Sequence, residues 1–448
     1  MKELEGYEGV AKELLLAAGA KVWDVLRVTT KDGRVYEGIL LPRNKFATPG
    51  YVELKLDNGY NVGFRVEGDV KVEVTGNHEA KYAIPQRDFP KKEGVPDVLI
   101  LGTGGTIASR LDYVTGGVIP AFTPGELFSA VPEIADACNV ETEMVFEIFS
   151  EDMTPEHWVQ LAEKVAKRAT EFDGIVVGHG TDTMAYTAAA LSFMIDDLNV
   201  PVVLVGSQRS SDRPSSDAAV NLVNAVTVAA KAPFAEVVVC MLGTTSHEDG
   251  YVHRGTRVRK MHSSARHTFR TIGDVPLGKV RDGNVTLFHD DLRPRNDATP
   301  VARAKFEPKV ALLHAFPGMN PEVVDFLVDK GYRGLIVAGT GLGHVSHQLM
   351  PSLGRANEEG MVVGMTVQTL WGYTGMDVYE TGREEQALGI IPCQDMLPEV
   401  AYVKLGWLLA TCDDVEEVKR LLPLNLKGEI LPRETSLGYL IGQGVEDL

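Results

Sequence analysis

The sequence has few cysteines, no long uncharged apolar run and fewer basic than acidic side chains. The cysteines lie far apart without a CxxC pair, so we expect buried, reduced thiols in a cytoplasmic protein and neither disulfides nor a zinc site. They are Cys138, Cys240, Cys393 and Cys412. No uncharged apolar run reaches the roughly 18 residues that a membrane-spanning helix needs. Glutamates also interrupt the N-terminal stretch where a signal peptide has its apolar core, so we expect no secretory signal.

The charge balance limits what the chain can bind by itself. It has 44 basic and 62 acidic side chains, which gives a net charge of −18. Contacts to nucleic-acid phosphates need clustered Lys and Arg, so this balance argues against wrapping nucleic acid by charge alone. A partner protein that holds RNA remains compatible with it. Hydrophobic residues make up 44% of the 448, enough for the cores of two or three domains.

The first 90 residues have the pattern of a small β domain. Residues 4 to 19 carry apolar side chains at helical spacing. These are Val10, Leu14, Leu15 and Ala18. Four or five short alternating strands follow, separated by turn sequences such as Asp57-Asn58-Gly59. The pattern predicts a helix and a small closed barrel of the SH3 or Sm type over residues 1–90, because closure removes exposed sheet edges.

A different pattern begins at Asp97, after a proline-containing linker over residues 84–94. Fully apolar strands now alternate with helical segments, as in VLILGTGG, GIVVGHG, VPVVLVG and AEVVVCML. Such alternation predicts a doubly wound parallel sheet whose loops gather at the carboxyl ends of its strands. A second α/β block starts near Val310. We expect a catalytic α/β domain over residues 95–300 and a smaller C-terminal α/β domain over residues 310–448.

The turn after the first of these strands carries a candidate nucleophile. It does not match the GxGxxG nucleotide motif, because Ile107 stands where the third glycine belongs, and no GK[ST] occurs in the chain. Glycines that permit a tight turn are the simplest interpretation. Thr106, however, follows two glycines, so its hydroxyl is presented with backbone N–H groups beside it. An acyl-transfer nucleophile and its oxyanion hole need this arrangement.

The second turn, His179-Gly180-Thr181-Asp182-Thr183, follows the next clear strand. On its own it is consistent with a helix N-cap. A threonine nucleophile also needs a neighbouring base, which Thr181 and Asp182 can supply together with a lysine whose pKa is lowered by burial. Lys260 is the candidate, in a polar loop rich in arginine. Taken alone, such a basic cluster more often forms a solvated face or an anion-binding patch.

The histidines show no metal-ligand pattern. His344 and His347 are three residues apart, and His262 and His267 are five apart. Neither pair belongs to an HExxH sequence, so we favour surface or packing roles and predict no metal site.

Together the two turns resemble the signatures of the asparaginase–glutaminase family of the bacterial type. They correspond to residues 103–108 and 179–183, and the resemblance extends over roughly residues 95–448. The resemblance implies an asparaginase-like two-domain α/β fold. It also implies that Thr106 is the acylated nucleophile and that Thr181, Asp182 and Lys260 form the second catalytic group.

The same resemblance implies a substrate-binding set. Tyr113 corresponds to the tyrosine of a loop that closes over the substrate and helps to activate the nucleophile. Ser150 corresponds to a serine that holds the substrate α-carboxylate. The next position is often Gln in free-standing members of the family but is Glu151 here. A carboxylate at this position can pair with the α-ammonium group, and the choice between glutamine and asparagine stays open.

The front of the chain departs from ordinary asparaginases, which begin near their first signature. Here about 95 residues precede it, including the expected barrel. With the extended segment 260–267, this arrangement resembles the family of D-type subunits of the archaeal glutamyl-tRNA(Gln) amidotransferases. In that family the D-type subunit releases ammonia from an amide amino acid. The E-type subunit uses ATP and Mg²⁺ to activate glutamate misattached to tRNA(Gln), and then amidates it.

The resemblance therefore implies a set of partners. These are the E-type subunit of the amidotransferase, Glu-tRNA(Gln) bound through the complex, glutamine or asparagine as ammonia donor, and a second copy of this chain in a homodimer within a heterotetramer. No cofactor is expected in this chain, since ATP and Mg²⁺ belong to the partner subunit.

We thus expect a cytoplasmic amidase subunit of a tRNA-dependent amidotransferase. A free-standing L-asparaginase or glutaminase with an accessory N-terminal domain is the alternative within the same chemistry. A binding module with an inactive hydrolase domain is the alternative from another class. The intact set of Thr106, Thr181, Asp182 and Lys260 argues against the binding module.

Overall fold

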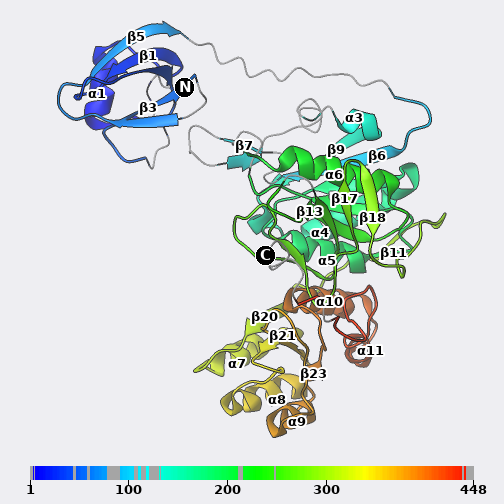
Figure 1. Cartoon of the computed structure of the whole chain (residues 1–448). Coiled ribbons are helices and arrows are strands. Elements are labelled where there is room, and N and C mark those ends of the chain that lie inside the picture. The colour runs from blue at the N-terminus through cyan, green and yellow to red at the C-terminus, as the bar shows by residue number, and fades with distance from the viewer. Residues whose placement is uncertain are drawn as a thin grey trace. The chain divides into compact units, whose positions relative to one another are not determined.

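The computed structural model divides the chain into two compact units (Figure 1). One comprises Met1–Gln86 and Ser109–Ile119, and the other comprises Arg87–Ala108 and Pro120–Leu448. The structure describes residues 4, 6–43, 47–57, 61–77, 91–104, 109–111, 118–120, 131, 133–209, 215–246, 249–435 and 438–439. The predicted linker over residues 84–94 lies mostly outside this described part.

The N-terminal unit is a helix followed by an antiparallel sheet of five strands in the order β4-β3-β2-β1-β5. Its elements are α1 (Gly9–Ala17), β1 (Asp24–Thr29), β2 (Val35–Leu40), β3 (Tyr51–Leu56), β4 (Asn61–Arg65) and β5 (Lys71–Asn77). The short pair β7 (Ser109–Leu111) and β8 (Val118–Pro120) forms a separate two-stranded sheet. The prediction of a small all-β domain after a helix is confirmed. Strands β4 and β5 lie at the two ends of the sheet, and no ladder joins them among the described residues.

One face of helix α1 packs into the core of this unit, and apart from Val10 it is the face that the spacing predicted. Ala11 and Leu15 are fully buried with Leu26, Val28 and other sheet residues, whereas Val10 is 52% exposed. Leu14 and Ala18 are partly buried against the same core, while Val10 lies in the first turn of the helix, which begins at Gly9. The predicted helix is therefore correct in type and, except for Val10, in its buried face.

The larger unit contains an eight-stranded sheet in the order β18-β17-β14-β13-β12-β10-β6-β9. Its strands are β6 (Asp97–Gly104), β9 (Asn139–Ile148), β10 (Gly174–Gly178), β12 (Val202–Val205), β13 (Val237–Leu242), β14 (Gly250–Arg254), β17 (Gly278–Arg281) and β18 (Asn284–Leu287). The apolar runs seen in the sequence are β6, β10, β12 and β13. They are almost completely buried, as strands covered on both faces must be.

The sheet is mixed rather than wholly parallel. Strands β9, β6, β10, β12 and β13 are parallel, while β14, β17 and β18 continue it as antiparallel strands. Helix α6 (Ala218–Lys231) lies on one side of the sheet, and α4 (Pro155–Arg168) and α5 (Met184–Met194) lie on the other (Figure 1). The short helix α3 (Ile134–Ala137) and the 3-10 turns η2 (Ser150–Asp152) and η3 (Ala169–Glu171) complete this block. The predicted doubly wound sheet is correct apart from its antiparallel edge.

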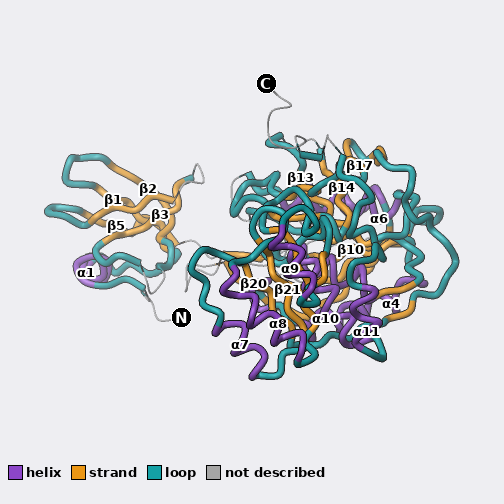
Figure 2. Tube along the Cα trace, turned by 90° about the horizontal axis from the view of Figure 1, so that it is seen from below, coloured by secondary structure: helices purple, strands orange, loops and turns teal. Residues whose placement is uncertain are grey.

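A second, wholly parallel sheet of four strands follows in the order β20-β21-β22-β23. Helices α7, α8, α9 and α10 lie around it (Figure 2). The elements are β20 (Val310–His314), α7 (Glu322–Asp329), β21 (Gly334–Gly339), η4 (His347–Leu349), α8 (Met350–Glu358), β22 (Val362–Val367), α9 (Glu380–Ala387), β23 (Ile391–Pro392), α10 (Pro398–Thr411) and α11 (Val415–Leu421). Among the described residues, no helix has both the length and the apolar character needed to span a bilayer.

Helix α10 joins the two sheets of the larger unit through aromatic contacts. Trp407 stacks on Phe193 of α5 with ring centroids 5.7 Å apart. Phe306, in the connection between the blocks, lies against Gly406 so closely that a Cβ on this glycine would be 2.2 Å from the ring. A two-stranded pair, β11 (Ile195–Asp196) with β19 (Val301–Ala302), fixes the same connection. The two blocks therefore share an apolar core, and the C-terminal block has a second core of its own.

The segment after α11 is fastened to α10 by a buried ion pair. Lys404 Nζ lies 2.6 Å from Glu429 Oε1, and both side chains are 0% exposed. The Glu429 carboxylate also accepts hydrogen bonds from the backbone N–H groups of Leu426 and Lys427. Lys404 donates to the Leu422 carbonyl as well. Each charge thus has several partners, which a buried ion pair needs in order to offset its desolvation.

We expect Glu429→Gln to lower the free energy of unfolding by about 3–5 kcal/mol, because it leaves the Lys404 ammonium buried without a counter-charge. Glu416→Gln, which breaks the solvent-exposed pair with Lys419, is the control and should cost less than about 1 kcal/mol. Urea unfolding followed by circular dichroism measures both. Equal small losses for the two variants would contradict the stabilising role of the buried Lys404–Glu429 pair.

Candidate active site

The two signature turns start side by side at one edge of the larger sheet. Strand β6 pairs in parallel with β10, with Gly102 opposite Gly178. The Thr103 hydroxyl donates to the Gly178 carbonyl over 2.8 Å, which ties the start of the first turn to the start of the second. Thr106 lies two residues beyond Gly104, outside the described residues. The polar turns gather here because parallel strands place their carboxyl ends at the same edge.

The second turn contacts a lysine that is distant in the sequence. Lys260 Nζ lies 2.9 Å from Thr181 Oγ1 and 2.6 Å from Asp182 Oδ1. Lys260 is largely buried, with 13% of its side chain exposed, whereas the Asp182 side chain is 66% exposed. The amine that the sequence predicted as part of one group thus contacts both the hydroxyl and the carboxylate of that group.

Ser150 and Glu151 approach the same turn from η2, which follows β9. Ser150 is buried and touches Gly180: a Cβ on this glycine would lie 2.7 Å from Ser150 Cβ and 2.8 Å from its Oγ. The Thr183 hydroxyl donates to the Ser150 carbonyl over 2.7 Å. Glu151, the next residue, is exposed. The structure therefore places the predicted substrate-binding serine directly against the turn that carries Thr181.

Two predicted site residues cannot be located in this geometry. Thr106 and Tyr113 both lie outside the described residues. Their assignment as nucleophile and loop tyrosine stays a prediction from the sequence.

Lys260 lies on a strand rather than in the polar loop that the sequence suggested. Strand β15 (Val258–Lys260) pairs with β16 (Phe269–Thr271) in a hairpin, with Lys260 opposite Phe269. The alternation explains the change, because Val258 and Phe269 are fully buried and hold the hairpin against the core. The loop sequence begins only after Lys260.

Arg257, the residue before β15, fixes the base of this hairpin. Its guanidinium lies 2.9 Å from Asp395 Oδ2 and donates to the Glu429 carbonyl over 3.0 Å. It also donates from Nε to the Ile272 carbonyl across the hairpin. Burial lowers the pKa of Arg257 below its ordinary value, and the nearby Asp395 carboxylate opposes this change. Arg257 thus links the lysine-bearing hairpin to the C-terminal block.

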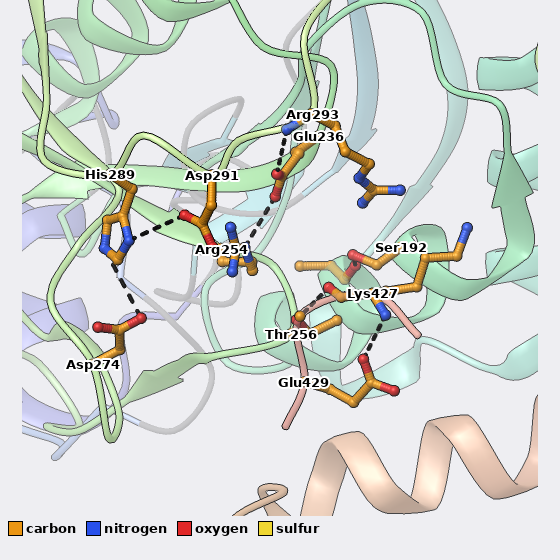
Figure 3. Close-up of polar contacts among 12 residues, drawn as sticks. Ser192, Glu236, Arg254, Thr256, Asp274, His289, Asp291, Arg293, Lys427 and Glu429 are labelled. Carbon is orange, nitrogen blue, oxygen red and sulfur yellow. Dashed lines mark hydrogen bonds and ion pairs between the residues drawn. The ribbon is translucent and has the colours of Figure 1, made fainter. Parts of the chain in front are cut away.

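The turn that precedes the hairpin is held by further polar contacts (Figure 3). Thr256 Oγ1 donates to the Lys427 carbonyl over 3.1 Å, and Arg254 Nε lies 3.0 Å from Glu236 Oε2. Farther along the strand, Arg259 lies 3.5 Å from the buried Glu399 carboxylate of α10. Burial raises the pKa of Glu399, and Arg259 opposes this change.

Three of the arginines around Lys260 therefore do not form the solvated face or anion patch that such a cluster usually makes. Arg254, Arg257 and Arg259 each lie beside a carboxylate that is mostly buried. Their charges are compensated within the fold, which leaves Lys260 as the cation that contacts Thr181 and Asp182. The anion-patch interpretation of these three residues is wrong.

The remaining predictions about cysteine and histidine can be placed as well. All four cysteines are free, and Cys138, Cys240 and Cys393 are buried, as expected for reduced thiols. His344 packs edge-on against Tyr379, with ring centroids 5.6 Å apart, while His347 is exposed.

A pocket of about 660 Å³ near this part of the C-terminal block is lined in part by Asp377, Gln386 and Asp395.

Sequence reasoning missed the residues that support the site. Arg257, Asp395, Glu399 and Glu429 carried no signal in the sequence, because each finds its partner more than a hundred residues away along the chain or in another block. The identity of an arginine in the sequence does not show whether it is buried or exposed. Only the three-dimensional contacts distinguish them.

The geometry permits one kind of chemistry most readily. A hydroxyl in contact with an amine that also contacts a carboxylate can exchange protons with a bound substrate or with water, as general acid–base catalysis requires.

Comparisons with known proteins agree with this architecture. Three family models match the chain: "GatD N-terminal domain" over residues 20–75, "Asparaginase, N-terminal" over residues 97–293 and "Glutaminase/Asparaginase C-terminal domain" over residues 309–422. The two asparaginase models cover the two blocks of the larger unit. The first model covers most of the five-stranded sheet of the N-terminal unit.

Several curated proteins are similar over nearly their whole length. The D-type subunit of the glutamyl-tRNA(Gln) amidotransferase of Methanopyrus kandleri is 49% identical over 439 residues, which is 96% of each chain. The corresponding D-type subunit of Pyrococcus furiosus is 48% identical over 440 residues, covering 96% of this chain and 99% of that protein.

Solved structures of similar fold include L-asparaginases. The thermostable L-asparaginase from Thermococcus kodakarensis has a TM-score of 0.68 and 32% identity, covering 75% of this chain and 99% of that one. L-asparaginase I from Vibrio cholerae has a TM-score of 0.66 and 29% identity, covering 75% of this chain and 100% of that one. The predicted asparaginase-like fold is confirmed.

The contact of Lys260 with Thr181 generates a direct test. We expect Lys260→Met to lower kcat for hydrolysis of a side-chain amide about 100- to 10,000-fold, because it removes the amine that exchanges protons with the hydroxyl. The exposed Lys305→Met is the matched control and should leave kcat unchanged. Steady-state ammonia release with equal amounts of folded protein is the measurement. Full activity of Lys260→Met would remove Lys260 from the catalytic group.

Proposed function

Because the chain belongs to the family of D-type glutamyl-tRNA(Gln) amidotransferase subunits, we propose that it is the amide-hydrolysing subunit of a tRNA-dependent amidotransferase. In this role it releases ammonia from glutamine or asparagine. A partner subunit then uses the ammonia to convert Glu-tRNA(Gln) into Gln-tRNA(Gln). The contact of Lys260 with Thr181 and Asp182, beside the start of the first signature turn, is the observation that carries the proposal.

Hydrolysis proceeds through an ester on Thr106. Its hydroxyl oxygen attacks the carbon of the side-chain amide, the C–N bond breaks, and the nitrogen leaves as ammonia after taking up a proton. Water then attacks the ester, which releases the acid product and restores the Thr106 hydroxyl. Backbone N–H groups of the glycine-rich turn stabilise the negative charge on the carbonyl oxygen during both attacks.

The described residues have distinct tasks in this scheme. Thr181, Asp182 and Lys260 move protons for the two attacks, supported by their distances of 2.6 and 2.9 Å from the lysine nitrogen. Ser150 holds the α-carboxylate of the amino acid, and the exposed Glu151 pairs with its α-ammonium group. Tyr113 closes over the bound substrate.

The N-terminal unit distinguishes this function from that of a free-standing asparaginase. The L-asparaginase structures cover 75% of this chain, whereas the D-type subunits match 96% of it. The part beyond the asparaginase blocks includes the segment that matches the "GatD N-terminal domain". We propose that ATP and Mg²⁺ act at the partner subunit, and that two copies of this chain assemble with two partner subunits.

We expect Thr106→Val to abolish both amide hydrolysis and glutamine-dependent formation of Gln-tRNA(Gln), with a loss of at least about a thousandfold. Added ammonium salt should still support amidation by the complex, because the variant removes only the source of ammonia. The assay follows conversion of Glu-tRNA(Gln) with each nitrogen donor.

The control is the thermal midpoint of the variant complex, which should match that of the wild type because valine has nearly the volume of threonine. A folded complex that fails to use ammonium would contradict the role of ammonia donor. Retained hydrolysis in Thr106→Val would contradict the assignment of the nucleophile instead.

A further inference from the structure

His179 is a fully buried histidine immediately before the Gly180-Thr181-Asp182 turn. It stands at the carboxyl end of β10, where its backbone N–H donates to the Val205 carbonyl of the neighbouring strand. Its side chain has no contact with Lys260 or Asp182 among the hydrogen bonds of the described residues. The proposed mechanism gives it no part.

The imidazole belongs to a chain of hydrogen bonds that runs through the core from α4 to the turn. Trp158 Nε1 donates to Thr187 Oγ1 over 3.0 Å. Thr187 Oγ1 lies 2.9 Å from His179 Nε2, and His179 Nδ1 lies 2.7 Å from the Gly180 carbonyl oxygen. Trp158, Thr187 and His179 are all buried.

The partners assign the proton positions along this chain. A carbonyl oxygen can only accept, so His179 Nδ1 carries a proton and donates it to Gly180. Burial lowers the pKa of His179 to about 4, which keeps the ring neutral and leaves Nε2 as an acceptor. The indole N–H can only donate, so Thr187 accepts from Trp158 and gives its own proton to Nε2. In each of these hydrogen bonds the donor lies on the Trp158 side and the acceptor on the Gly180 side.

The Gly180–Thr181 peptide is therefore held from two sides. The imidazole fixes its carbonyl oxygen on one side. On the other side the Ser150 side chain lies so close that a Cβ on Gly180 would be 2.7 Å from Ser150 Cβ. Rotation of this peptide would move the Thr181 hydroxyl, which now lies 2.9 Å from Lys260 Nζ.

We propose that His179 is a positioning residue for the catalytic turn: its Nδ1–H holds the Gly180 carbonyl so that the Thr181 hydroxyl faces Lys260. The inference rests on the proposed function, since it assigns the imidazole to amide hydrolysis. His179 takes no proton from the substrate in this role, because both ring nitrogens are already engaged inside the core. Trp158 and Thr187 fix its tautomer through the hydrogen bond to Nε2.

Two substitutions distinguish the hydrogen bond made by His179 Nδ1 from the one made by Nε2. Asparagine places an amide N–H near the position of Nδ1, so His179→Asn keeps the donor to Gly180. Glutamine reaches the position of Nε2, so His179→Gln keeps a partner for Thr187 and loses that donor. We expect His179→Gln to lower kcat about 100-fold with KM changed less than about threefold, since a misplaced catalytic group costs rate more than binding.

His179→Asn should retain kcat within about tenfold of the wild type. The variants are compared in the full chain after their thermal midpoints show that both are folded. Equal losses in the two variants would reduce His179 to a packing residue and overturn the proposal, as would full activity of His179→Gln.

A readout independent of activity comes from the wild-type chain labelled with 15N-histidine. The His179 resonances, identified by their disappearance in His179→Asn, should show a protonated Nδ1 and an unprotonated Nε2. The opposite tautomer or an imidazolium at neutral pH would overturn the proposal. The inactive control Thr181→Val should keep the same tautomer. Absence of amide hydrolysis in the wild type would instead refute the proposed function while leaving the tautomer result intact.

Discussion

The parallel pairing of β6 with β10 is the constraint on which the rest of the site depends. Because Gly102 stands opposite Gly178, the two signature turns leave the sheet at the same edge and next to each other. Neither turn is a site by itself. Their pairing ties Thr103, at the start of the first turn, to Gly178, and Lys260 contacts Thr181 and Asp182 in the second turn.

Holding Lys260 requires the second block of the larger unit. The hairpin that carries it is only three residues deep on each strand, too short to be rigid alone. Arg257, which precedes this hairpin, and Arg259, within it, pair with Asp395 and Glu399. The segment that contains Glu429, whose carbonyl accepts from Arg257, is held in turn by the buried ion pair of Glu429 with Lys404. The C-terminal block thus acts on the catalytic group through charge pairs that are shielded from water, where such pairs are strong and costly to break.

Much of this fold could be predicted from the sequence, because its signals are local. The apolar runs that form β6, β10, β12 and β13 are bounded by glycine and contain almost no polar residues, so burial on both faces follows from composition. The contact among Thr181, Asp182 and Lys260 could be predicted as well, on the strength of a family resemblance.

Other features had no local signal. The antiparallel edge of β14, β17 and β18 depends on which strands meet in space. The sequence around Lys260 predicts a loop, since its polar residues outnumber Val258 and Phe269, yet the structure has a hairpin there. His179 carries no signal in the sequence beyond its place in the second turn. Its hydrogen bonds depend on Trp158 and Thr187, which come from two different helices. Thr106 and Tyr113 lie outside the described residues, so their roles remain predictions.

The measurement that tests the central claim most directly is ammonia release from glutamine by the purified chain. It is made first with the chain alone and then with its co-purified partner subunit, glutamate-charged tRNA and ATP with Mg²⁺. The account predicts a large rise in ammonia release when the mixture is complete, because hydrolysis serves amidation at the partner. High activity of the chain alone, unchanged by every addition, would contradict it and identify a self-sufficient asparaginase or glutaminase.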